Sequence, residues 1–400
     1  MKYIVIVPDG MADLPLEELS GKTPLEAAHT LNMDFLARNG NVGMIKTIPD
    51  GLNPGSEIGN LSLLGYNPKK VFSGRAPLEA ANLGIDLAKD EIAFRCNLVT
   101  ALDKKMVDYS AGHIKDKEAA LIINTLNEHV AEDGVRFYTG KSYRHIMVIK
   151  VRDIKEFLNI KCTPPHDIMS KEIARYLPQG PGSKILLKLM EKSKAILADH
   201  PVNNVRIDLK ENPANLIWLW GQGVKPALPS FKEKYGVDGG IISAVDLVNG
   251  IGRLAGLDVI RVPGITGYYD TNYLGKAEYA LNALKTKNFV YIHIEAPDEA
   301  GHNGDAKAKM ECIEKIDREI IGTILTHFDA HADVRILVLS DHPTPVSLRT
   351  HTREPVGFVM YGKGIPLDPV DMFNEITAKS KGLKYQNGEA LMEVFMNKYL

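Results

Sequence analysis

The hydrophobic pattern of the chain alternates between short apolar runs and longer stretches with helical spacing. The short runs are rich in β-branched residues and end in polar or Gly-containing turns, which is typical of buried parallel strands. They span residues 3–7, 217–220, 240–242, 258–262, 289–294 and 335–340. Between them, residues 243–255 and 305–328 carry apolar side chains at the spacing of an amphipathic helix. This alternation predicts an α/β fold, a mostly parallel sheet with helices on both faces.

The middle of the chain follows a different order of elements. Two strand-like stretches flank one helical pattern, and a second helical pattern follows, at residues 92–99, 115–130, 143–151 and 183–199. Such an order is typical of an α+β domain rather than of a regular strand–helix–strand repeat. We therefore expect a smaller domain over residues 86–212, inserted into a discontinuous core of residues 1–85 and 213–400.

Charge narrows the class of partner. The 400 residues include 48 Lys and Arg against 50 Asp and Glu, a formal net charge of −2. This balance gives no electrostatic footprint for nucleic acid or anionic lipid, so we expect a small-molecule substrate and neither a nucleic-acid nor a membrane partner. A homo-oligomer is compatible with the sequence.

Cysteine usage and the start of the chain bear on location. Cys96, Cys162 and Cys312 are widely spaced, which fits neither a disulfide framework nor a zinc ribbon, and we interpret them as reduced core residues. The chain enters a predicted strand at Ile4 without the charged segment and longer apolar stretch of a leader, and no apolar run is long enough to span a bilayer. The expected location is the cytoplasm.

Acidic and imidazole side chains follow several of the predicted strands. In an open parallel sheet, ligands bind outside the carboxyl ends of the strands, so these polar residues are candidates for one site. They are Asp9, Asp298, His302, Asp341, His342 and His351. Carboxylate and imidazole without thiolate suits Mn²⁺, Zn²⁺ or Fe, and two ions are the economical interpretation. Any one of these Asp residues could instead be a helix cap or turn residue.

Ser56 is a candidate nucleophile. A Pro-Gly turn at residues 54–55 precedes it and a helical pattern follows, which places its hydroxyl at a helix N-terminus. On its own, such a serine is more often a simple N-cap. Beside a metal cluster it becomes a nucleophile candidate, because metal coordination is one of the few ways to ionise a serine hydroxyl at neutral pH.

Basic side chains are candidate anion ligands. Phosphate recognition uses several cations, because each guanidinium matches phosphate oxygens in pairs, although a single Arg or Lys is usually a solvated surface residue. The candidates are Arg75, Arg95, Arg144, Arg206, Lys276 and Arg353, with His113 and His166 as weaker ones. The sequence has no P-loop, no Gly-rich dinucleotide motif after the first strand and no G-x-S-x-G elbow.

Six segments, spread over nearly the whole chain, form a specific pattern. They are residues 8–11 (PDGM), 54–66 (PGSEIGNLSLLGY), 73–81 (SGRAPLEAA), 297–302 (PDEAGH), 340–342 (SDH) and 351–352 (HT). In this order they resemble the alkaline phosphatase superfamily and, within it, the archaeal-type cofactor-independent phosphoglycerate mutases. The resemblance implies an alkaline-phosphatase-like core with an inserted domain, which matches the division predicted above.

The resemblance also implies roles for the candidate residues. One metal ion would be held by Asp298, His302 and His351, and the other by Asp9, Ser56, Asp341 and His342. Mn²⁺ is the ion we expect, with Zn²⁺, Co²⁺ or Mg²⁺ as alternatives. Ser56 would attack the phosphate of 3-phosphoglycerate to give a phosphoserine, and the 2-hydroxyl of the bound glycerate would then take the phosphate, independently of 2,3-bisphosphoglycerate. Lys276 would hold phosphate, and the inserted domain would close over the glycerate.

The chain departs from the archaeal pattern within the insert. Where those mutases carry Asp-Arg-Arg-Ala-Gly-Arg, residues 108–113 are Asp-Tyr-Ser-Ala-Gly-His. This resembles a bacterial branch of the family whose members have been labelled both phosphoglycerate mutases and proposed homoserine kinases. The substrate contacts expected here are Lys276, Arg75, Arg95, Arg144, His113 and Arg206. The alternatives are a phosphotransferase acting on homoserine, a phosphatase, and a metal-binding module without catalysis.

Overall fold

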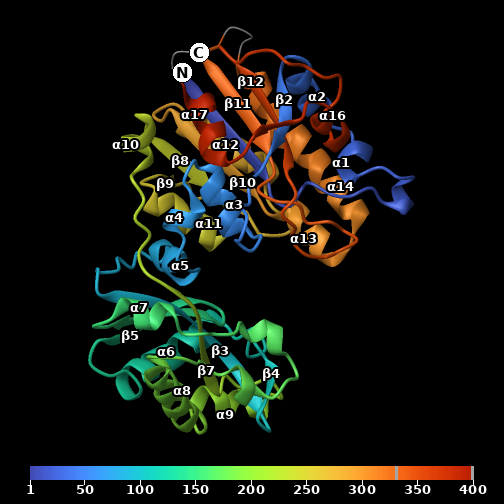
Figure 1. Ribbon diagram of the computed structural model, residues 1–400. Coiled ribbons are helices and arrows are strands. Elements are labelled where there is room, and N and C mark those ends of the chain that lie inside the picture. Colours follow the sequence, from blue (N-terminus) through green and yellow to red (C-terminus); the bar gives the residue numbers. More distant parts are fainter. Residues whose placement is uncertain (329–331, 398–400) are drawn as a thin grey trace. The chain divides into compact units, whose positions relative to one another are not determined.

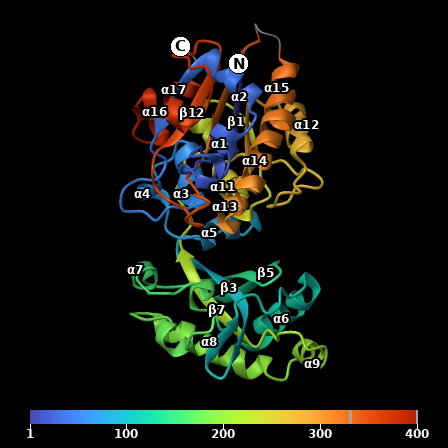
Figure 2. The same ribbon diagram turned by 90° about the vertical axis from the view of Figure 1, so that its right-hand side faces the viewer.

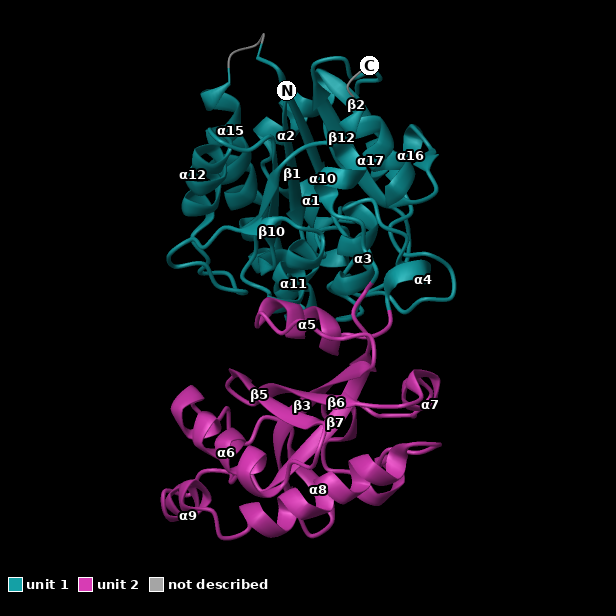
Figure 3. Cartoon of the chain, turned by 90° about the vertical axis from the view of Figure 1, so that its left-hand side faces the viewer, with its two compact units in different colours: residues 1–72, 227–400 teal, residues 73–226 magenta. Residues whose placement is uncertain are grey.

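The computed structural model describes residues 1–328 and 332–397. The chain forms two compact units, one of residues Met1–Phe72 and Ala227–Leu400 and the other of residues Ser73–Pro226 (Figure 3). Unit 2 is therefore larger at both ends than the insert expected over 86–212. The reason is that helix α5 (Ala76–Asn82) and strand β7 (Leu216–Gly223) both pack on strand β3 (Glu91–Leu102).

Unit 1 is built on one eight-stranded sheet with the strand order β13-β2-β12-β11-β1-β10-β8-β9. The parallel centre contains β11 (Val334–Leu339), β1 (Lys2–Pro8), β10 (Phe289–Ile294), β8 (Gly239–Ile242) and β9 (Asp258–Val259). These five strands contain or overlap five of the six runs predicted as parallel strands, all but 217–220. The sheet continues with β12 (Val356–Gly362), which is antiparallel to both of its neighbours, β11 and β2 (Gly40–Ile45). At the edge, β13 (Leu383–Tyr385) is parallel to β2.

Helices cover both faces of this sheet, which confirms the predicted α/β architecture (Figures 1 and 2). One face carries α2 (Leu31–Arg38), α12 (Tyr273–Ala283), α14 (Ala306–Lys315) and α15 (Gly322–His327). The other carries α3 (Ser56–Leu63), α11 (Asp246–Leu254) and α17 (Gly388–Met396). Shorter helices of unit 1 are α1 (Pro24–Ala27), α4 (Pro68–Val71), α10 (Phe231–Tyr235), α13 (Ala296–Asn303) and α16 (Glu375–Ser380). None of the helices in the described part of the chain is long and apolar enough to cross a membrane.

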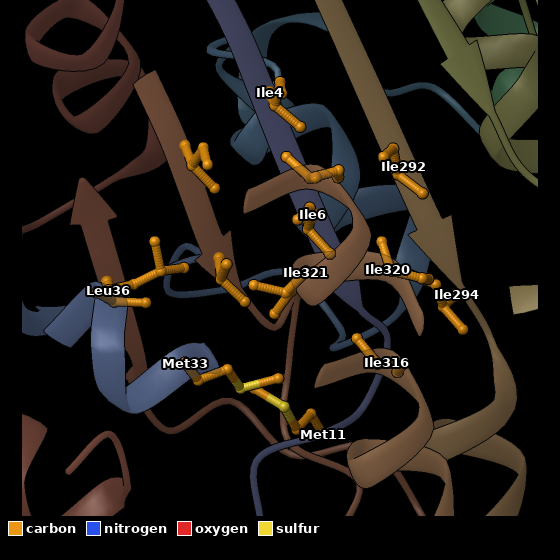
Figure 4. Close-up of a cluster of buried hydrophobic side chains, with 14 of the residues drawn as sticks. Ile4, Ile6, Met11, Met33, Leu36, Ile292, Ile294, Ile316, Ile320 and Ile321 are labelled. Atoms are coloured by element: carbon orange, nitrogen blue, oxygen red, sulfur yellow. The ribbon is translucent and has the colours of Figure 1, made fainter. Parts of the chain in front are cut away.

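The long helix predicted over residues 305–328 is interrupted by a π-helical segment, Ile316–Ile321. Its isoleucines pack against the even-numbered side chains of β1, among them Ile4 and Ile6, and against β10 (Figure 4). Alternate residues of a strand point to one face of the sheet, and residues three or four apart share one face of a helix, so the two patterns meet in one core. This core fixes the sheet whose strand ends carry the candidate site.

Truncation of this core should lower the stability of the protein. Ile320 is fully buried, and Ile320→Ala is expected to reduce the free energy of unfolding by about 2–5 kcal/mol through lost burial and the cavity left behind. The matched control is Ile207→Ala, at a side chain that is 53% exposed, where the expected change is within about 0.5 kcal/mol. Urea titrations of the three proteins measure this difference, and equal loss from both substitutions would contradict the assigned core.

Unit 2 is an α+β unit with a five-stranded antiparallel sheet. The strand order is β4-β3-β6-β5, and β7 pairs with the other edge of β3. Strand β4 spans Lys105–Asp108, β5 spans Val135–Lys141 and β6 spans Arg144–Lys150. Helices α6 (Asp116–His129), α8 (Ser183–Leu197) and α9 (Pro201–Asp208) contribute to the core of this unit together with the sheet, and α7 (Ile154–Leu158) is a short helix. The prediction that 217–220 is a parallel strand of the main sheet is wrong, because β7 lies antiparallel to β3. Both kinds of buried strand are continuous apolar runs, so the run alone could not distinguish them.

Candidate active site and metal centre

The candidate site lies at the carboxyl ends of three adjacent parallel strands, β11, β1 and β10. Asp9 directly follows β1, and Asp341 follows β11 after one serine; both carboxylates are fully buried. Asp298 belongs to α13, which begins just after β10, and is 3% exposed. Helices α3 and α13 lie at the same end of the sheet (Figure 1). The strand order therefore gathers residues that are more than three hundred positions apart in the sequence, such as Asp9 and Asp341.

One half of the site contains Asp9, Ser56, Asp341 and His342. Ser56 is the first residue of α3, and its hydroxyl donates to Asp9 Oδ2 at 3.3 Å and lies 3.4 Å from His342 Nε2. His342 Nε2 is in turn 3.5 Å from Asp9 Oδ1 and 3.6 Å from Asp341 Oδ2. The hydroxyl, two carboxylates and one imidazole thus converge on a small volume, as ligands of one cation do.

Helix α3 positions Ser56 through contacts with the strand ends. Asn60, one turn after Ser56, donates to Asp341 Oδ2 and to the Ser56 carbonyl, both at 2.8 Å. Tyr291 of β10 donates its hydroxyl proton to Asn60 Oδ1 at 2.6 Å. Gly59 allows the close approach, since a Cβ there would lie 2.6 Å from the Asp341 carbonyl oxygen. Asn60 is not among the site residues predicted from the sequence, although its one-turn spacing from Ser56 was a usable signal.

The other half contains Asp298, His302 and His351. His302 Nε2 lies 3.2 Å from Asp298 Oδ2 and 2.9 Å from His351 Nε2, and His351 Nε2 lies 3.4 Å from Asp298 Oδ1. The backbone carbonyl of Arg349 lies 3.0 Å from His302 Nδ1, which fits a His302 that donates from Nδ1 and leaves Nε2 for the site. The four-residue spacing of Asp298 and His302 on α13 puts both on one face of the helix, as the spacing predicted.

The structure adds His293 and Glu295 to the site. Fully buried His293, on β10, places Nε2 3.0 Å from Asp9 Oδ2 without hydrogen-bond geometry, and ligand atoms of Asp9, His293 and Asp341 all lie within 4.8 Å of one another. Glu295 groups with Asp9 and Asp298 in the same way. Asp9 Oδ1, His293 Nε2 and Glu295 Oε2 have no hydrogen-bond partner among the described residues. Buried polar atoms normally have partners, so these donors fit a bound divalent cation.

The electrostatics of the site point the same way. Burial, and then the charges of Asp341, Glu295 and Asp298, raise the pKa of Asp9 well above its ordinary value. Burial and the charge of Asp298 also raise the pKa of Glu295 to about 8, and burial lowers the pKa of His293 to about 4. Without a cation, the site is a group of buried carboxylates that oppose one another's ionisation. A divalent ion would remove that opposition.

Two residues that were expected to contact substrate, Lys276 and Arg206, are buried instead. Lys276, on α12, is fully buried and donates to the His293 carbonyl at 2.7 Å, and burial lowers its pKa to about 7. Arg206 is 1% exposed inside unit 2, where it pairs with Glu118 at 2.7 Å and Glu211 at 3.0 Å. These contacts give Arg206 a structural role in unit 2. Lys276 supports the backbone beneath the site, a position that the sequence could not distinguish from one facing substrate.

Two of the other expected cations, Arg95 and Arg144, lie in unit 2 beside aromatic rings, whereas Arg353 belongs to unit 1. Arg95 pairs with Glu79 at 3.0 Å and lies 4.2 Å over the Trp220 ring, and Arg144 lies 5.7 Å over Tyr143. Exposed His113 is 6.0 Å from Tyr143, between ring centroids. His166, Tyr109 and Trp220 extend the same row of rings. Burial lowers the pKa of His166, and the charges of Arg95 and Arg75 lower it further, so these two cations share one region of unit 2.

Known proteins that resemble this chain in sequence share one description. The family model for 2,3-bisphosphoglycerate-independent phosphoglycerate mutase matches residues 37–203. A mutase of that name from Methanothrix thermoacetophila is 48% identical over 398 residues, which are 99% of this chain and 100% of the relative. A probable mutase of that name from Geobacter sulfurreducens is 46% identical over 407 residues, with 100% of both chains covered.

Solved structures show the same fold. A protein of Pyrococcus horikoshii superposes with a TM-score of 0.84 at 32% identity, covering 99% of this chain and 97% of that one. The cofactor-independent phosphoglycerate mutase of Thermoplasma acidophilum superposes with a TM-score of 0.69 at 28% identity, covering 99% of both chains.

Proposed function

Because the chain belongs to the family of 2,3-bisphosphoglycerate-independent phosphoglycerate mutases, we propose that it interconverts 3-phosphoglycerate and 2-phosphoglycerate through a phosphoserine at Ser56. The observation that carries the proposal is the Ser56 hydroxyl, which lies at the start of α3 within 3.4 Å of Asp9 and His342. A binding module would not need a hydroxyl in contact with a carboxylate and an imidazole.

Divalent metal ions are implied by the family, and the donor set of this chain fits them. We propose that Asp9, Ser56, Asp341 and His342 hold one ion and that Asp298, His302 and His351 hold the other, with Mn²⁺ as the resident metal. His293 is a further candidate ligand of the ion beside Asp9. When bound, such ions lower the pKa of a coordinated hydroxyl and neutralise phosphoryl oxygens.

The chain's own residues would divide the reaction into two balanced transfers. Ser56 Oγ loses its proton and attacks the phosphorus of 3-phosphoglycerate, so that an Oγ–P bond forms while the bond between phosphorus and the 3-oxygen breaks and that oxygen takes up a proton. The glycerate then reorients, and its 2-hydroxyl loses a proton and takes the phosphoryl group, while the Oγ–P bond breaks and Ser56 Oγ regains a proton. No net proton is released, and no second phosphorylated cofactor is required.

Recognition of the glycerate carboxylate is assigned to the cations of unit 2. Arg75, Arg95 and Arg144 are proposed to bind it, with His113 where the archaeal mutases have an arginine. Buried Lys276 would act on the site through the His293 carbonyl that it holds. A homo-oligomeric state and a cytoplasmic location stay predictions.

A pair of assays on one preparation tests the function. Conversion of 3-phosphoglycerate is followed by coupling to enolase with Mn²⁺ present and 2,3-bisphosphoglycerate absent, and phosphorylation of homoserine is followed with ATP and the same ion. The proposal expects turnover in the first assay and none in the second. Turnover with homoserine alone would mean that unit 2 serves another acceptor.

Metal binding should depend strongly on pH. The hydrogen bond to Asp298 raises the pKa of His302 to about 9, so the metal-free protein carries a proton on His302 at pH 7 that a metal ion must displace. The dissociation constant for Mn²⁺ is therefore expected to fall at least about tenfold per pH unit between pH 7 and about 9, and to depend less on pH above that.

Calorimetric titrations of metal-free protein at several pH values measure this dependence. The His302→Gln variant should bind Mn²⁺ more weakly, and its affinity should change less steeply with pH, by the equivalent of one released proton. An affinity that does not change between pH 7 and 9 would show that His302 is not a metal ligand.

A further inference from the structure

The Thr344 hydroxyl joins the two halves of the site. Thr344 is fully buried, two residues after His342, and its Oγ1 donates a short hydrogen bond to Asp298 Oδ1. The same oxygen lies 3.3 Å from His342 Nδ1. Asp298 and His342 belong to the two different proposed ligand sets, so one hydroxyl contacts a member of each.

The chemistry of a hydroxyl fixes the direction of both contacts. A threonine has one hydroxyl proton and two acceptor lone pairs. Since that proton is donated to Asp298, the contact with His342 requires Nδ1–H to donate to Thr344 Oγ1. His342 then carries its proton on Nδ1 and presents an unprotonated Nε2 to the site, 3.4 Å from Ser56 Oγ. A neutral imidazole with a free Nε2 is the form that binds a metal ion.

Thr344 is itself held rigidly. Lys309 Nζ donates to the Thr344 carbonyl at 2.9 Å and to Asp13 Oδ2 at 2.6 Å, and both charged side chains are fully buried. On the other side, Gly10 has a positive φ of 61°, and a Cβ there would lie 2.6 Å from Thr344 Oγ1. These contacts leave the hydroxyl little freedom to turn away from Asp298 and His342.

We propose that Thr344 is a positioning residue that sets the tautomer of His342 and the orientation of Asp298, and so couples the two metal sites. The proposal rests on the proposed function for the presence of the ions. Thr344 touches neither substrate nor metal in this account and acts only through the two ligands that it contacts.

Two substitutions separate the hydroxyl from the shape of the side chain. Thr344→Val keeps the branched shape and removes the hydroxyl, whereas Thr344→Ser keeps the hydroxyl. Thr100→Val is the matched control, because Thr100 is equally buried in unit 2 and donates to the Pro213 carbonyl at 2.7 Å. It loses a buried hydrogen bond without any contact to the site.

The experiment has two readouts. Calorimetry measures the affinity for Mn²⁺, and a long-range ¹H–¹⁵N correlation spectrum of metal-free protein reports the tautomer of His342. Thr344→Val is expected to weaken Mn²⁺ binding about 10–100-fold and to shift His342 away from the Nδ1–H tautomer. Thr344→Ser and Thr100→Val should keep the wild-type affinity within about threefold, since both leave a hydroxyl at position 344 in contact with Asp298 and His342.

The outcomes distinguish this inference from the proposed function. If the wild-type protein binds Mn²⁺ and Thr344→Val shows the same affinity and the same His342 tautomer, only the role of Thr344 is overturned. Equal losses in Thr344→Val and Thr344→Ser would also overturn it, because packing rather than the hydroxyl would then be responsible. A wild-type protein that does not bind Mn²⁺ would overturn the proposed metal sites themselves.

Discussion

Replacing Ser56 with alanine is expected to lower mutase turnover by about 10⁴–10⁶-fold, the range typical for removal of an enzyme nucleophile. The substitution removes the oxygen that would carry the phosphoryl group between the two positions of glycerate, and no other hydroxyl is placed to replace it in the proposed mechanism. The fold should be preserved, because Ser56 is the first residue of α3 and not part of a core. Circular dichroism and Mn²⁺ titration check folding and metal binding beside the enolase-coupled rate.

Ser62→Ala provides the matched control for this experiment. Ser62 lies on the same helix, six residues after Ser56, and its hydroxyl oxygen accepts a hydrogen bond from the Gly388 amide at 3.2 Å. Its loss should cost a small amount of stability and leave the rate close to wild type. A Ser56→Ala protein with wild-type turnover would remove Ser56 as the nucleophile.

The Asp9→Asn variant should show opposite effects on activity and stability. Asp9 is fully buried, and its charge is opposed by burial and by Asp341, Glu295 and Asp298. An amide removes that charge at nearly the same volume, so the metal-free variant should melt roughly 2–4 °C higher, the shift that about 1 kcal/mol produces in a unit of this size. Turnover should fall on the order of 10³-fold or more, because an anionic ligand is lost.

Differential scanning calorimetry of chelator-treated protein and the coupled assay with Mn²⁺ measure the two effects. Asp34→Asn serves as the control, since Asp34 on α2 is also buried with a raised pKa, and it accepts from the Phe373 amide outside the site. We expect this control to keep wild-type turnover. A lower melting temperature for metal-free Asp9→Asn would contradict the charge repulsion assigned to the site.

The sequence predicted the parts of the fold that depend on local pattern. The even-numbered side chains of β1 and the isoleucines of Ile316–Ile321 have the periods of a strand and a helix, and both elements are present. Two features depend on long-range pairing instead. The apolar run of β7 predicts one more parallel strand, but β7 joins the sheet of unit 2, and β12 lies in the main sheet antiparallel to both of its neighbours, β11 and β2. Periodicity does not specify the partner of a strand.

The same division applies to the candidate site. Residues that directly follow strands, such as Asp9 and Asp341, could be collected because the carboxyl ends of parallel strands share one edge. His293 lies within β10 and Thr344 in a loop, so their roles follow only from the three-dimensional contacts. Arg206 illustrates the reverse case, because nothing in the sequence indicated that Glu118 and Glu211 would surround it.

Residues 108–113 in unit 2 depart from the archaeal pattern, and aromatic rings lie beside the basic side chains of the same unit. Arg95 stacks on Trp220, and His113 and Arg144 both lie beside Tyr143. The Tyr143 ring supports exposed Arg144 without neutralising its charge, whereas Arg95 is paired with the Glu79 carboxylate as well as stacked on Trp220. Arg144 therefore remains available for an anionic substrate, which is consistent with the proposed recognition of a carboxylate.

The most direct test of the central claim is a ³¹P NMR time course of 3-phosphoglycerate with the protein and Mn²⁺, without 2,3-bisphosphoglycerate or any nucleotide. The account predicts that the resonance of 2-phosphoglycerate grows to its equilibrium intensity while inorganic phosphate does not accumulate, and that a chelator stops the conversion. Release of inorganic phosphate without 2-phosphoglycerate, or no change at all, would contradict it.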